Sequence, residues 1–422
     1  MHWILFVFFS RLLSSVGCST EPVRPVSRKV IRDPPQKLSV NPSSSENAED
    51  SLSLLLMGDT QHYYHCEDVN YPCKLVTEDI RRTFHMARNN SFPAGFKPNQ
   101  TLLEAQQTTY EIESRYSNRV QKESIVKFIN DQIGKPSALI INGDITQNGW
   151  QDELEEFHTN WLTNISIPIL LGLGNHDYQN NLKTCKNCTH SMLQWYTSYL
   201  EKMSLNSDVH KTKNKSETIV AGSMSWTKKM CSANAKTCAH VLQLNNKLDY
   251  ELDFAFGSVH WNISSPRRYL LNELNRLHNT TLPILVNIHQ LNGLDQPKMK
   301  KLLAKRVFEE SVTNPEKVPK IAVFNAHWHE SHNATIECIH GYKVPFIFVG
   351  SVPRNRFSFL QMDQNEATIT GYEAIDMTLS KGAGFRKLES VKLFGKCEIT
   401  VRLQFGEVSS NEPTHLASLL EP

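Results

Sequence analysis

The stretch SLSLLLMGD, residues 51–59, joins a run of apolar side chains to a Gly-Asp pair. Four later stretches have the same form: SALIINGD (137–144), IPILLGLGNHD (167–177), LPILVNIH (282–289) and KIAVFNAHWH (320–329). Short runs that are apolar throughout are typical of strands that are covered on both faces. The sequence therefore predicts a set of buried strands, each of which ends in a polar group.

Helical patterns separate these runs. Apolar residues recur at helical spacing in 118–133, 152–163 and 190–202, and again after Pro266. After residue 340 the pattern becomes rich in strands. Alternation of strand and helix predicts an α/β fold in which helices cover the faces of a sheet.

Every apolar run ends in side chains that bind metals in other proteins. In chain order these are Asp59, Asp144, Asn175 with His176, His289, and His327 with His329. Such a mixture of oxygen and nitrogen donors suits zinc, manganese or iron. Taken singly, Gly-Asp is more often a turn and a histidine is more often structural. The ordered set at five strand ends favours two ions about 3.5–4 Å apart, because a single ion would leave buried polar groups unpaired.

Five motifs in this order resemble the calcineurin-like metallophosphoesterases. They are GDTQ (58–61), GDITQNG (143–149), GNHD (174–177), NIHQ (287–290) and AHWH (326–329), and the resemblance covers about residues 53–365. It implies a four-layer α/β/β/α sandwich of two mixed β-sheets flanked by helices, with the metal motifs on the first sheet. The implied activity is hydrolysis of a phosphate monoester or diester by a hydroxide that two divalent metal ions (Zn, Mn or Fe) activate.

The resemblance also implies a role for each motif residue. Asp59, His329 and Gln61 would hold the first metal, Asp144 would bridge the two ions, and Asn175, His289 and His327 would hold the second. His176 would contact the phosphoryl oxygens or protonate the leaving group, and Asp177 would orient it. Arg354 and Arg356 are candidates for binding the substrate.

Two motif positions depart from the family pattern. Gln61 stands where the family has histidine, and a neutral amide suits zinc-like ions less well than imidazole does. Ala326 stands in place of glycine. The alternative function is therefore a catalytically weakened secreted glycoprotein that uses the phosphoesterase scaffold for binding. Asn245 and Asn246 either line the site or form a turn, and the turn is favoured.

The chain divides into four predicted parts. Residues 1–18 are typical of a signal peptide, 19–50 of a disordered linker or pro-segment, and 411–422 of a C-terminal tail. One metallophosphoesterase domain is expected at 51–410, with insertions at about 65–117 and 203–240.

Sequons and cysteines point to an oxidising compartment. Asn-x-Ser/Thr occurs at Asn89, Asn99, Asn164, Asn187, Asn214, Asn262, Asn279 and Asn333. Eight cysteines remain if cleavage removes Cys18: Cys66, Cys73, Cys185, Cys188, Cys231, Cys238, Cys338 and Cys397. Eight cysteines allow 105 connectivities, among which the spacing suggests the local pairs Cys66/Cys73, Cys185/Cys188 and Cys231/Cys238; Cys185 and Cys188 would also suit half of a zinc site. We expect a protein that is either secreted or located in the lumen of a lysosome or vesicle.

Charge and composition exclude several classes of protein. Apolar residues are 40% and charged residues 21% of the chain, which excludes a mainly disordered, collagenous or coiled-coil protein. The 45 basic and 43 acidic residues give a net charge of +2, so no nucleic-acid-binding surface is expected. No later run has 18 apolar residues, and no membrane span is predicted. The expected partner is a phosphate-ester substrate.

Overall fold

A computed structural model of the chain describes residues 50–61, 100–132, 135–291, 293–313, 318–329, 333–377 and 384–397, without the side chains of 100–113. Within these residues the chain forms two large mixed sheets and a smaller third one. The predicted signal peptide, most of the linker and the C-terminal tail lie outside the described residues, as do Asn89, Asn99, Cys66 and Cys73.

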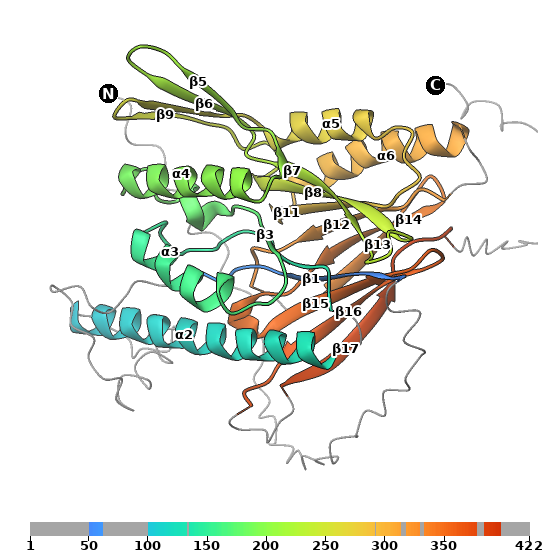
Figure 1. The fold of residues 1–422 in the computed structure, drawn as a ribbon, viewed down its shortest axis with the longest axis horizontal. Coiled ribbons are helices and arrows are strands. Elements are labelled where there is room, and N and C mark those ends of the chain that lie inside the picture. Colours follow the sequence, from blue (N-terminus) through green and yellow to red (C-terminus); the bar gives the residue numbers. More distant parts are fainter. Residues whose placement is uncertain are drawn as a thin grey trace, which may run out of the picture. The chain divides into compact units, whose positions relative to one another are not determined.

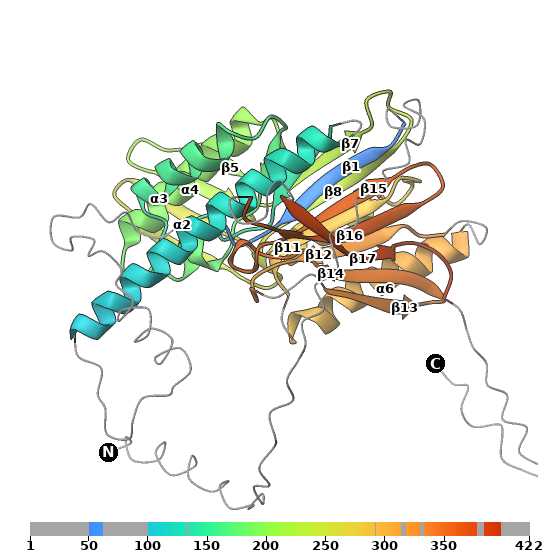
Figure 2. The same cartoon turned by 90° about the horizontal axis from the view of Figure 1, so that it is seen from below.

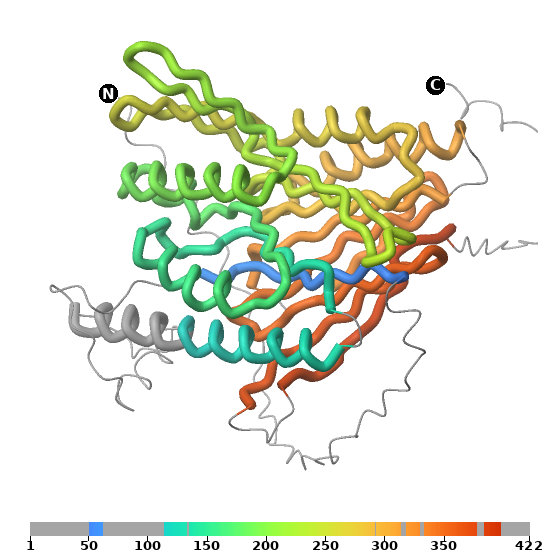
Figure 3. Tube along the Cα trace, in the orientation of Figure 1, coloured from blue at the N-terminus to red at the C-terminus, as the bar shows by residue number. Residues whose placement is uncertain are grey.

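The first large sheet has six strands in the order β17-β16-β15-β1-β2-β3. Its strands are β1 (Leu52–Met57), β2 (Ala138–Ile141), β3 (Ile169–Leu171), β15 (Arg356–Met362), β16 (Ala367–Ala374) and β17 (Phe385–Lys392). β1 runs parallel to β2 and antiparallel to β15. In Figure 3 the blue trace of β1 therefore runs beside orange segments from the far end of the chain.

The second large sheet has seven strands in the order β13-β14-β12-β11-β8-β7-β4. Its strands are β4 (Asn206–Ser207), β7 (Trp226–Cys231), β8 (Cys238–Lys247), β11 (Ile284–Gln290), β12 (Ile321–Asn325), β13 (Asn333–Ile339) and β14 (Tyr342–Phe348). β11 lies between the parallel strands β8 and β12. The four-stranded sheet contains β5 (His210–Lys213), β6 (Thr218–Gly222), β9 (Leu252–Phe256) and β10 (Val259–Ile263).

Helices cover the outer faces of the two large sheets (Figure 1). The α-helices are α2 (Gln100–Asp131), α3 (Gln151–Phe157), α4 (Lys186–Lys202), α5 (Pro266–Arg276) and α6 (Asp295–Thr313). Shorter helical turns are η2 (His158–Leu162), η3 (Asn175–Gln179) and η4 (Val352–Arg354). Figure 2 shows α2 and α6 on opposite sides of the strands.

The side chains of the second sheet alternate between two cores, as the period of a strand requires. Leu285 and Phe324 join the core that also contains the first sheet. Val286 and Val323, one residue away in each strand, join a separate core with α5 and α6. On the outer face of the first sheet, Phe128 of α2 contacts aromatic rings of β15, β16 and β17. The predicted α/β fold, with mixed sheets flanked by helices, is confirmed.

The expectation that the first sheet carries all of the metal motifs was wrong. Asp59, Asp144 and Asn175 follow β1, β2 and β3, whereas His289 lies in β11 and His327 follows β12 in the second sheet. β11 pairs with β8 rather than with β3, so the later motifs belong to the facing sheet. The ligands consequently meet between two sheets instead of along one edge.

The two stretches predicted as insertions differ in their structure. Helix α2 begins within the first stretch and continues to Asp131. The second stretch supplies β5 and β6 to the small sheet, and β4, β7 and the first residues of β8 to the seven-stranded sheet. None of the described helices combines the length and the apolar character that a membrane span requires.

Candidate metal centre

The polar residues at the strand ends form two overlapping groups of potential metal ligands. Asp144, His289 and His327 form one group, and Asp59, Asp144 and His329 form the other, with the ligand atoms of each group within 4.8 Å of one another. Asp144 belongs to both groups, which is the arrangement that a bridging carboxylate requires. The residues come from both large sheets, and Asp59, Asp144 and His289 are fully buried.

The nitrogen and oxygen atoms around His289 converge on one point. Its Nε2 lies 3.1 Å from Oδ2 of Asp144, 3.1 Å from Oδ1 of Asn175 and 3.3 Å from Nδ1 of His327. The Nδ1 of His289 faces the carbonyl of Asn142 at 2.8 Å, which fixes the ring. Two imidazoles, an amide oxygen and a carboxylate that face each other are a donor set for a divalent cation.

Charges within this cluster depend on one another. Burial alone would raise the pKa of Asp144, but the charges of His289 and His176 and the hydrogen bonds from both together lower that pKa to about 2. Burial would lower the pKa of His289, but Asp144, with smaller contributions from Asp59 and the carbonyl of Asn142, raises it to about 9. Burial and then the positive charge of His289 lower the pKa of His327 to about 4. The buried carboxylate of Asp144 thus favours positive charge beside it, whether from a proton on His289 or from a bound cation. His327 stays neutral, with a lone pair available for binding a metal.

The second group is looser and includes the unusual Gln61. The Nε2 of His329 lies 3.6 Å from Oδ1 of Asp59, and both oxygens of Asp59 accept from the backbone N–H of His327 at 3.2 Å. The Nε2 of Gln61 donates to Oδ2 of Asp144 at 3.1 Å, whereas its Oε1 is buried without a hydrogen-bond partner among the described residues. A buried oxygen without a donor is costly unless something else binds it, so Gln61 fits a cation at this position.

Glycines allow the close packing of this cluster. Gly143 has φ +84°, and a Cβ there would lie 2.7 Å from the ring of His289. A Cβ at Gly174 would lie 2.2 Å from Oδ1 of Asp144. Larger residues at these two positions would push the ligands apart.

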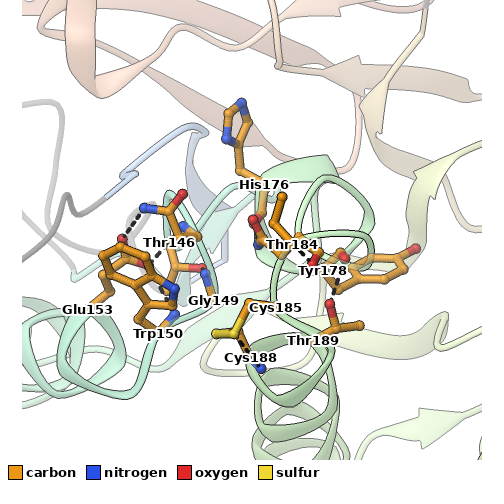
Figure 4. The surroundings of a disulfide bond; sticks show 12 residues. Thr146, Gly149, Trp150, Glu153, His176, Tyr178, Thr184, Cys185, Cys188 and Thr189 are labelled. Atoms are coloured by element: carbon orange, nitrogen blue, oxygen red, sulfur yellow. Dashed lines mark hydrogen bonds between the residues drawn. A yellow bond between two sulfur atoms is a disulfide. The ribbon is translucent and has the colours of Figure 1, made fainter. Parts of the chain in front are cut away.

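His176 is partly exposed, and two hydrogen bonds to neighbouring loops fix its position. Its Nδ1 faces the carbonyl of Gln147 at 3.0 Å, so Nδ1 carries the hydrogen and Nε2 is left available. Its backbone N–H donates to Oδ1 of Asp144 at 2.9 Å. Figure 4 shows the imidazole pointing away from the neighbouring Cys185–Cys188 disulfide.

Asp177 does not orient the ring of His176, contrary to the sequence-based expectation. One of its oxygens accepts from the N–H and the hydroxyl of Thr146 at 2.9 and 3.0 Å, and the other accepts from the N–H of Gly174 at 2.8 Å. Burial and the charge of Asp144 raise the pKa of Asp177 to about 7, although these three donors act against the rise. Asp177 therefore ties the loop after β2 to the loop after β3.

The two arginines differ in their surroundings. The Nε of Arg354 donates to the carbonyl of His329 at 2.7 Å, which places this exposed side chain beside the ligand turn. Arg356 lies instead 2.7 Å from Glu373, its neighbour across β15 and β16. Of the two substrate-binding candidates, only Arg354 lies next to a candidate ligand in the described part of the chain.

Asn245 and Asn246 do not form the favoured turn but end strand β8. Both are buried. Nδ2 of Asn246 donates at 2.6 Å to Oε1 of Gln179, a residue shortly after the GNHD motif. Asn246 thus supports the loop that carries His176.

Sequence reasoning missed residues that act through their backbone or lie between motif positions. Thr146 binds Asp177, the carbonyl of Gln147 binds His176, and Asn142 binds His289. The sequence places all three within three residues of Asp144. Proximity to a motif aspartate was the signal that could have identified them.

The cysteines form three disulfides in the described part of the chain. Cys185–Cys188, Cys231–Cys238 and Cys338–Cys397 have Cα separations of 5.3, 4.0 and 6.1 Å. The bond between Cys185 and Cys188 leaves no free thiolates for half of a zinc site. All six sequon asparagines that the structure describes are exposed: Asn164, Asn187, Asn214, Asn262, Asn279 and Asn333.

Comparisons with known proteins agree with the motifs. A family model described as calcineurin-like phosphoesterase matches residues 53–350. No curated protein matches the sequence. Among solved structures, Vacuolar Protein Sorting 29 from Cryptosporidium parvum is 8% identical, with 82% of this chain and 99% of that one covered and a TM-score of 0.24. The calcineurin-like phosphoesterase YfkN from Bacillus subtilis is 10% identical, with 82% and 90% covered and a TM-score of 0.24. Scores this low carry no structural argument.

Proposed function

Because this chain belongs to the calcineurin-like phosphoesterase family, we propose that it hydrolyses a phosphate monoester or diester with two bound divalent metal ions. The observation that supports this most strongly is the meeting of Asp59, Asp144, Asn175, His289, His327 and His329 between the two sheets, with Asp144 in both groups. When bound, the two ions supply Lewis acidity, which activates water and neutralises phosphoryl charge.

The residues of the chain divide the remaining work among them. Asp144, Asn175, His289 and His327 would hold one ion, and Asp59, Gln61 and His329 would hold the other, with Asp144 shared between the two. Since the carbonyl of Gln147 holds the N–H at Nδ1 of His176, a second proton on the ring sits at Nε2, which as an imidazolium N–H would donate to the phosphoryl oxygens or give its proton to the leaving oxygen. Asp177 holds the loop that presents His176.

Hydrolysis of p-nitrophenyl phosphate and of its bis-ester, with Mn²⁺, Zn²⁺ or Fe²⁺ added, tests the proposal. We expect turnover with at least one metal, and its loss in Asp144→Asn. Asp131→Asn is the matched control, because Asp131 is an exposed carboxylate at the end of α2 that pairs with Lys127. Absence of turnover with every metal, or equal turnover in Asp144→Asn and wild type, would contradict an enzymatic role.

A second candidate is a binding protein on the same scaffold with weakened catalysis. Gln61 favours it, because its amide replaces a stronger ligand and donates its N–H to Asp144. Metal analysis of the purified protein separates the two candidates. Two equivalents per chain favour the enzyme, and almost no metal favours the binding protein.

We also propose that the chain is secreted or lumenal and glycosylated. Three disulfides and six exposed sequon asparagines in the described residues support this. Expression in a secreting eukaryotic cell tests it: the protein should reach the medium and lose apparent mass when N-glycans are removed enzymatically. Retention in the cytosol without glycans would contradict it.

A further inference from the structure

Trp328 is exposed at the metal centre. It stands between the two candidate ligands His327 and His329 and keeps 53% of its surface exposed. Trp161, Trp226 and Trp261 are instead almost completely buried in the core. Among the tryptophans that the structure describes, Trp328 is the only exposed one. A large exposed ring next to a site of chemistry often contacts a ligand.

The backbone around Trp328 fixes the direction of its side chain. His327 and His329, on either side, have φ values of +81° and +49°, which residues with a Cβ rarely adopt. The N–H of Trp328 donates to the carbonyl of Ala326 at 3.1 Å, and the N–H of His327 donates to Asp59. This tight turn positions two ligands and directs the indole between them towards solvent.

The indole contacts the imidazole of His327 in an edge-to-face arrangement. Its ring centroid lies 5.0 Å from that of His327, with an angle of 68° between the planes. This contact with His327 leaves 53% of the surface of Trp328 exposed. A planar group on a substrate bound at the centre can therefore pack against Trp328.

Arg354 adds a cation to the same turn. Its Nε is held by the carbonyl of His329 at 2.7 Å, while no described carboxylate lies within ion-pair distance of its guanidinium. Arg356, two residues later, is by contrast neutralised by Glu373. The guanidinium of Arg354, which has no ion-pair partner among the described residues, suits an anionic group on the substrate and would repel a cationic one.

We propose that Trp328 and Arg354 select phosphate esters that carry a planar aromatic group, nucleotides among them; the inference rests on the proposed phosphoesterase function. Trp328 supplies a stacking face, and Arg354 binds an anionic oxygen of the same substrate. A choline-type head group fits less well, because it requires several aromatic rings around the cation and Arg354 would oppose it. Stacking of a base on an aromatic side chain is favourable for every base, so discrimination among bases is not expected.

The test compares kcat/KM of wild type and Trp328→Ala for three esters: p-nitrophenyl phosphate, adenosine 5′-monophosphate and glycerol phosphate. The ratio of variant to wild type for each ester removes differences in intrinsic reactivity. We expect about a tenfold fall for the two aromatic esters and little change for the alkyl ester. Trp328→Phe should restore part of the loss, because it keeps an aromatic face. If kcat/KM falls for only one of the two aromatic esters, that ester shows whether an aryl group or a nucleobase is recognised.

Phe308→Ala is the matched control, because Phe308 on α6 is an aromatic residue with a similar exposed fraction of 52%. It should leave all three ratios unchanged, and thermal unfolding should confirm that each variant is folded. Equal losses for aromatic and alkyl esters in Trp328→Ala would overturn the proposal.

A binding measurement separates failure of this inference from failure of the proposed function. Adenosine 5′-monophosphate should quench tryptophan fluorescence of the metal-loaded wild type, and glycerol phosphate should not. The quenching should weaken in Trp328→Phe and in Arg354→Gln. If no ester is hydrolysed but this quenching is observed, the enzymatic function fails and recognition by Trp328 stands. If esters are hydrolysed but the nucleotide causes no quenching that depends on Trp328, recognition by Trp328 is contradicted and the enzymatic function stands.

Discussion

Five candidate ligands have backbone torsions that are rare for residues with a Cβ. Asp59, Gln61, Asp144, His327 and His329 all have positive φ values, between +32° and +81°. Such conformations cost about 1 kcal/mol or more each and persist only where the surrounding structure enforces them. Strain of this kind gathers at functional sites. The metal centre is therefore held in place by its surroundings against local preference.

Gly174→Ala is expected to disrupt the centre through one added methyl group. Its Cβ would lie 2.2 Å from Oδ1 and 2.5 Å from the backbone nitrogen of Asp144, so the shared carboxylate must move. We expect weaker metal binding and a loss of stability of about 1–3 kcal/mol, measured by metal titration and urea unfolding. Gly293→Ala is the control, since a Cβ there meets nothing within 4 Å. Unchanged metal affinity in Gly174→Ala would show that Asp144 does not depend on this packing.

Gln61→His is expected to strengthen metal binding. The present amide donates its N–H to Asp144 and offers a neutral oxygen, whereas an imidazole is a better ligand for zinc and related ions. Calorimetric titration with Zn²⁺ or Mn²⁺ should show tighter binding at the weaker of two sites. Gln151→His, on the exposed start of α3, should change nothing. Weaker binding in Gln61→His would mean that the site is built around the amide.

At the scale of elements, Asn118 of α2 connects two parts of the fold. Its Nδ2 donates to the carbonyl of Thr60, next to the first motif aspartate, at 2.7 Å. Its Oδ1 accepts from the indole N–H of Trp161 in η2 at 3.0 Å. α2 thereby supports the loop after β1 from outside the metal centre.

Asn118→Ala should destabilise the protein through both of these contacts. The variant would leave the carbonyl of Thr60 and the indole N–H of Trp161 without the partner that Asn118 supplies. Each buried polar group without a partner lowers the free energy of unfolding by about 1–3 kcal/mol. Urea unfolding measures the loss. Asn130→Ala, at an exposed position of the same helix, is the control for helix propensity. Equal stability of the two variants would show that water replaces Asn118.

His190 should make stability depend on pH. It lies in α4, where Nδ1 accepts from the indole N–H of Trp261 at 3.0 Å, and the ring of Phe256 packs 4.7 Å away. Burial lowers the pKa of His190 below its ordinary value of 6.5. The stabilising contribution is therefore present above pH 6.5 and is lost as the pH falls through the lowered pKa, because an imidazolium cannot accept from Trp261.

Comparison of unfolding free energies at pH 5 and pH 8 measures this effect. The fall in stability of wild type towards pH 5 should be smaller in His190→Gln, which keeps an acceptor for Trp261 but does not titrate. His278→Gln is the control, because His278 is an exposed histidine. An identical pH dependence in wild type and His190→Gln would contradict the prediction.

Local patterns in the sequence predicted the strands and their polar ends. They did not predict which strands pair with one another. An apolar run followed by Asp or His identifies a buried strand and its polar end, so Asp59, Asp144 and His289 were found. The partner of each strand depends on contacts between distant residues. Nothing local shows that β1 pairs with β15, or that β11 belongs to the facing sheet. For the same reason Asp177 was assigned to the adjacent His176, although its partners are Thr146 and Gly174.

At the scale of the whole molecule, the candidate metal ligands connect the two large sheets. Asp59 and Asp144 follow strands of the six-stranded sheet, whereas His289 lies in a strand of the seven-stranded sheet and His327 follows another. Direct contacts also connect the sheets: Nδ2 of Asn142 donates to the carbonyl of Phe324 at 3.0 Å. A cation held between the sheets would therefore stabilise the folded chain as one unit, because unfolding separates ligands that lie far apart in the sequence.

Removal of metal should accordingly lower the melting temperature of the protein. A ligand that binds only the folded state at a hundred times its Kd adds about 2.7 kcal/mol to the free energy of unfolding. Scanning calorimetry of the protein after chelation, and then with increasing Mn²⁺ or Zn²⁺, should show a rise that follows metal concentration. Asp144→Asn should melt at a temperature that metal does not change, because it removes the ligand common to both groups. Asp131→Asn should respond as wild type does. If wild type also fails to respond, the residues that meet between the sheets form a polar network that stabilises the fold without metal.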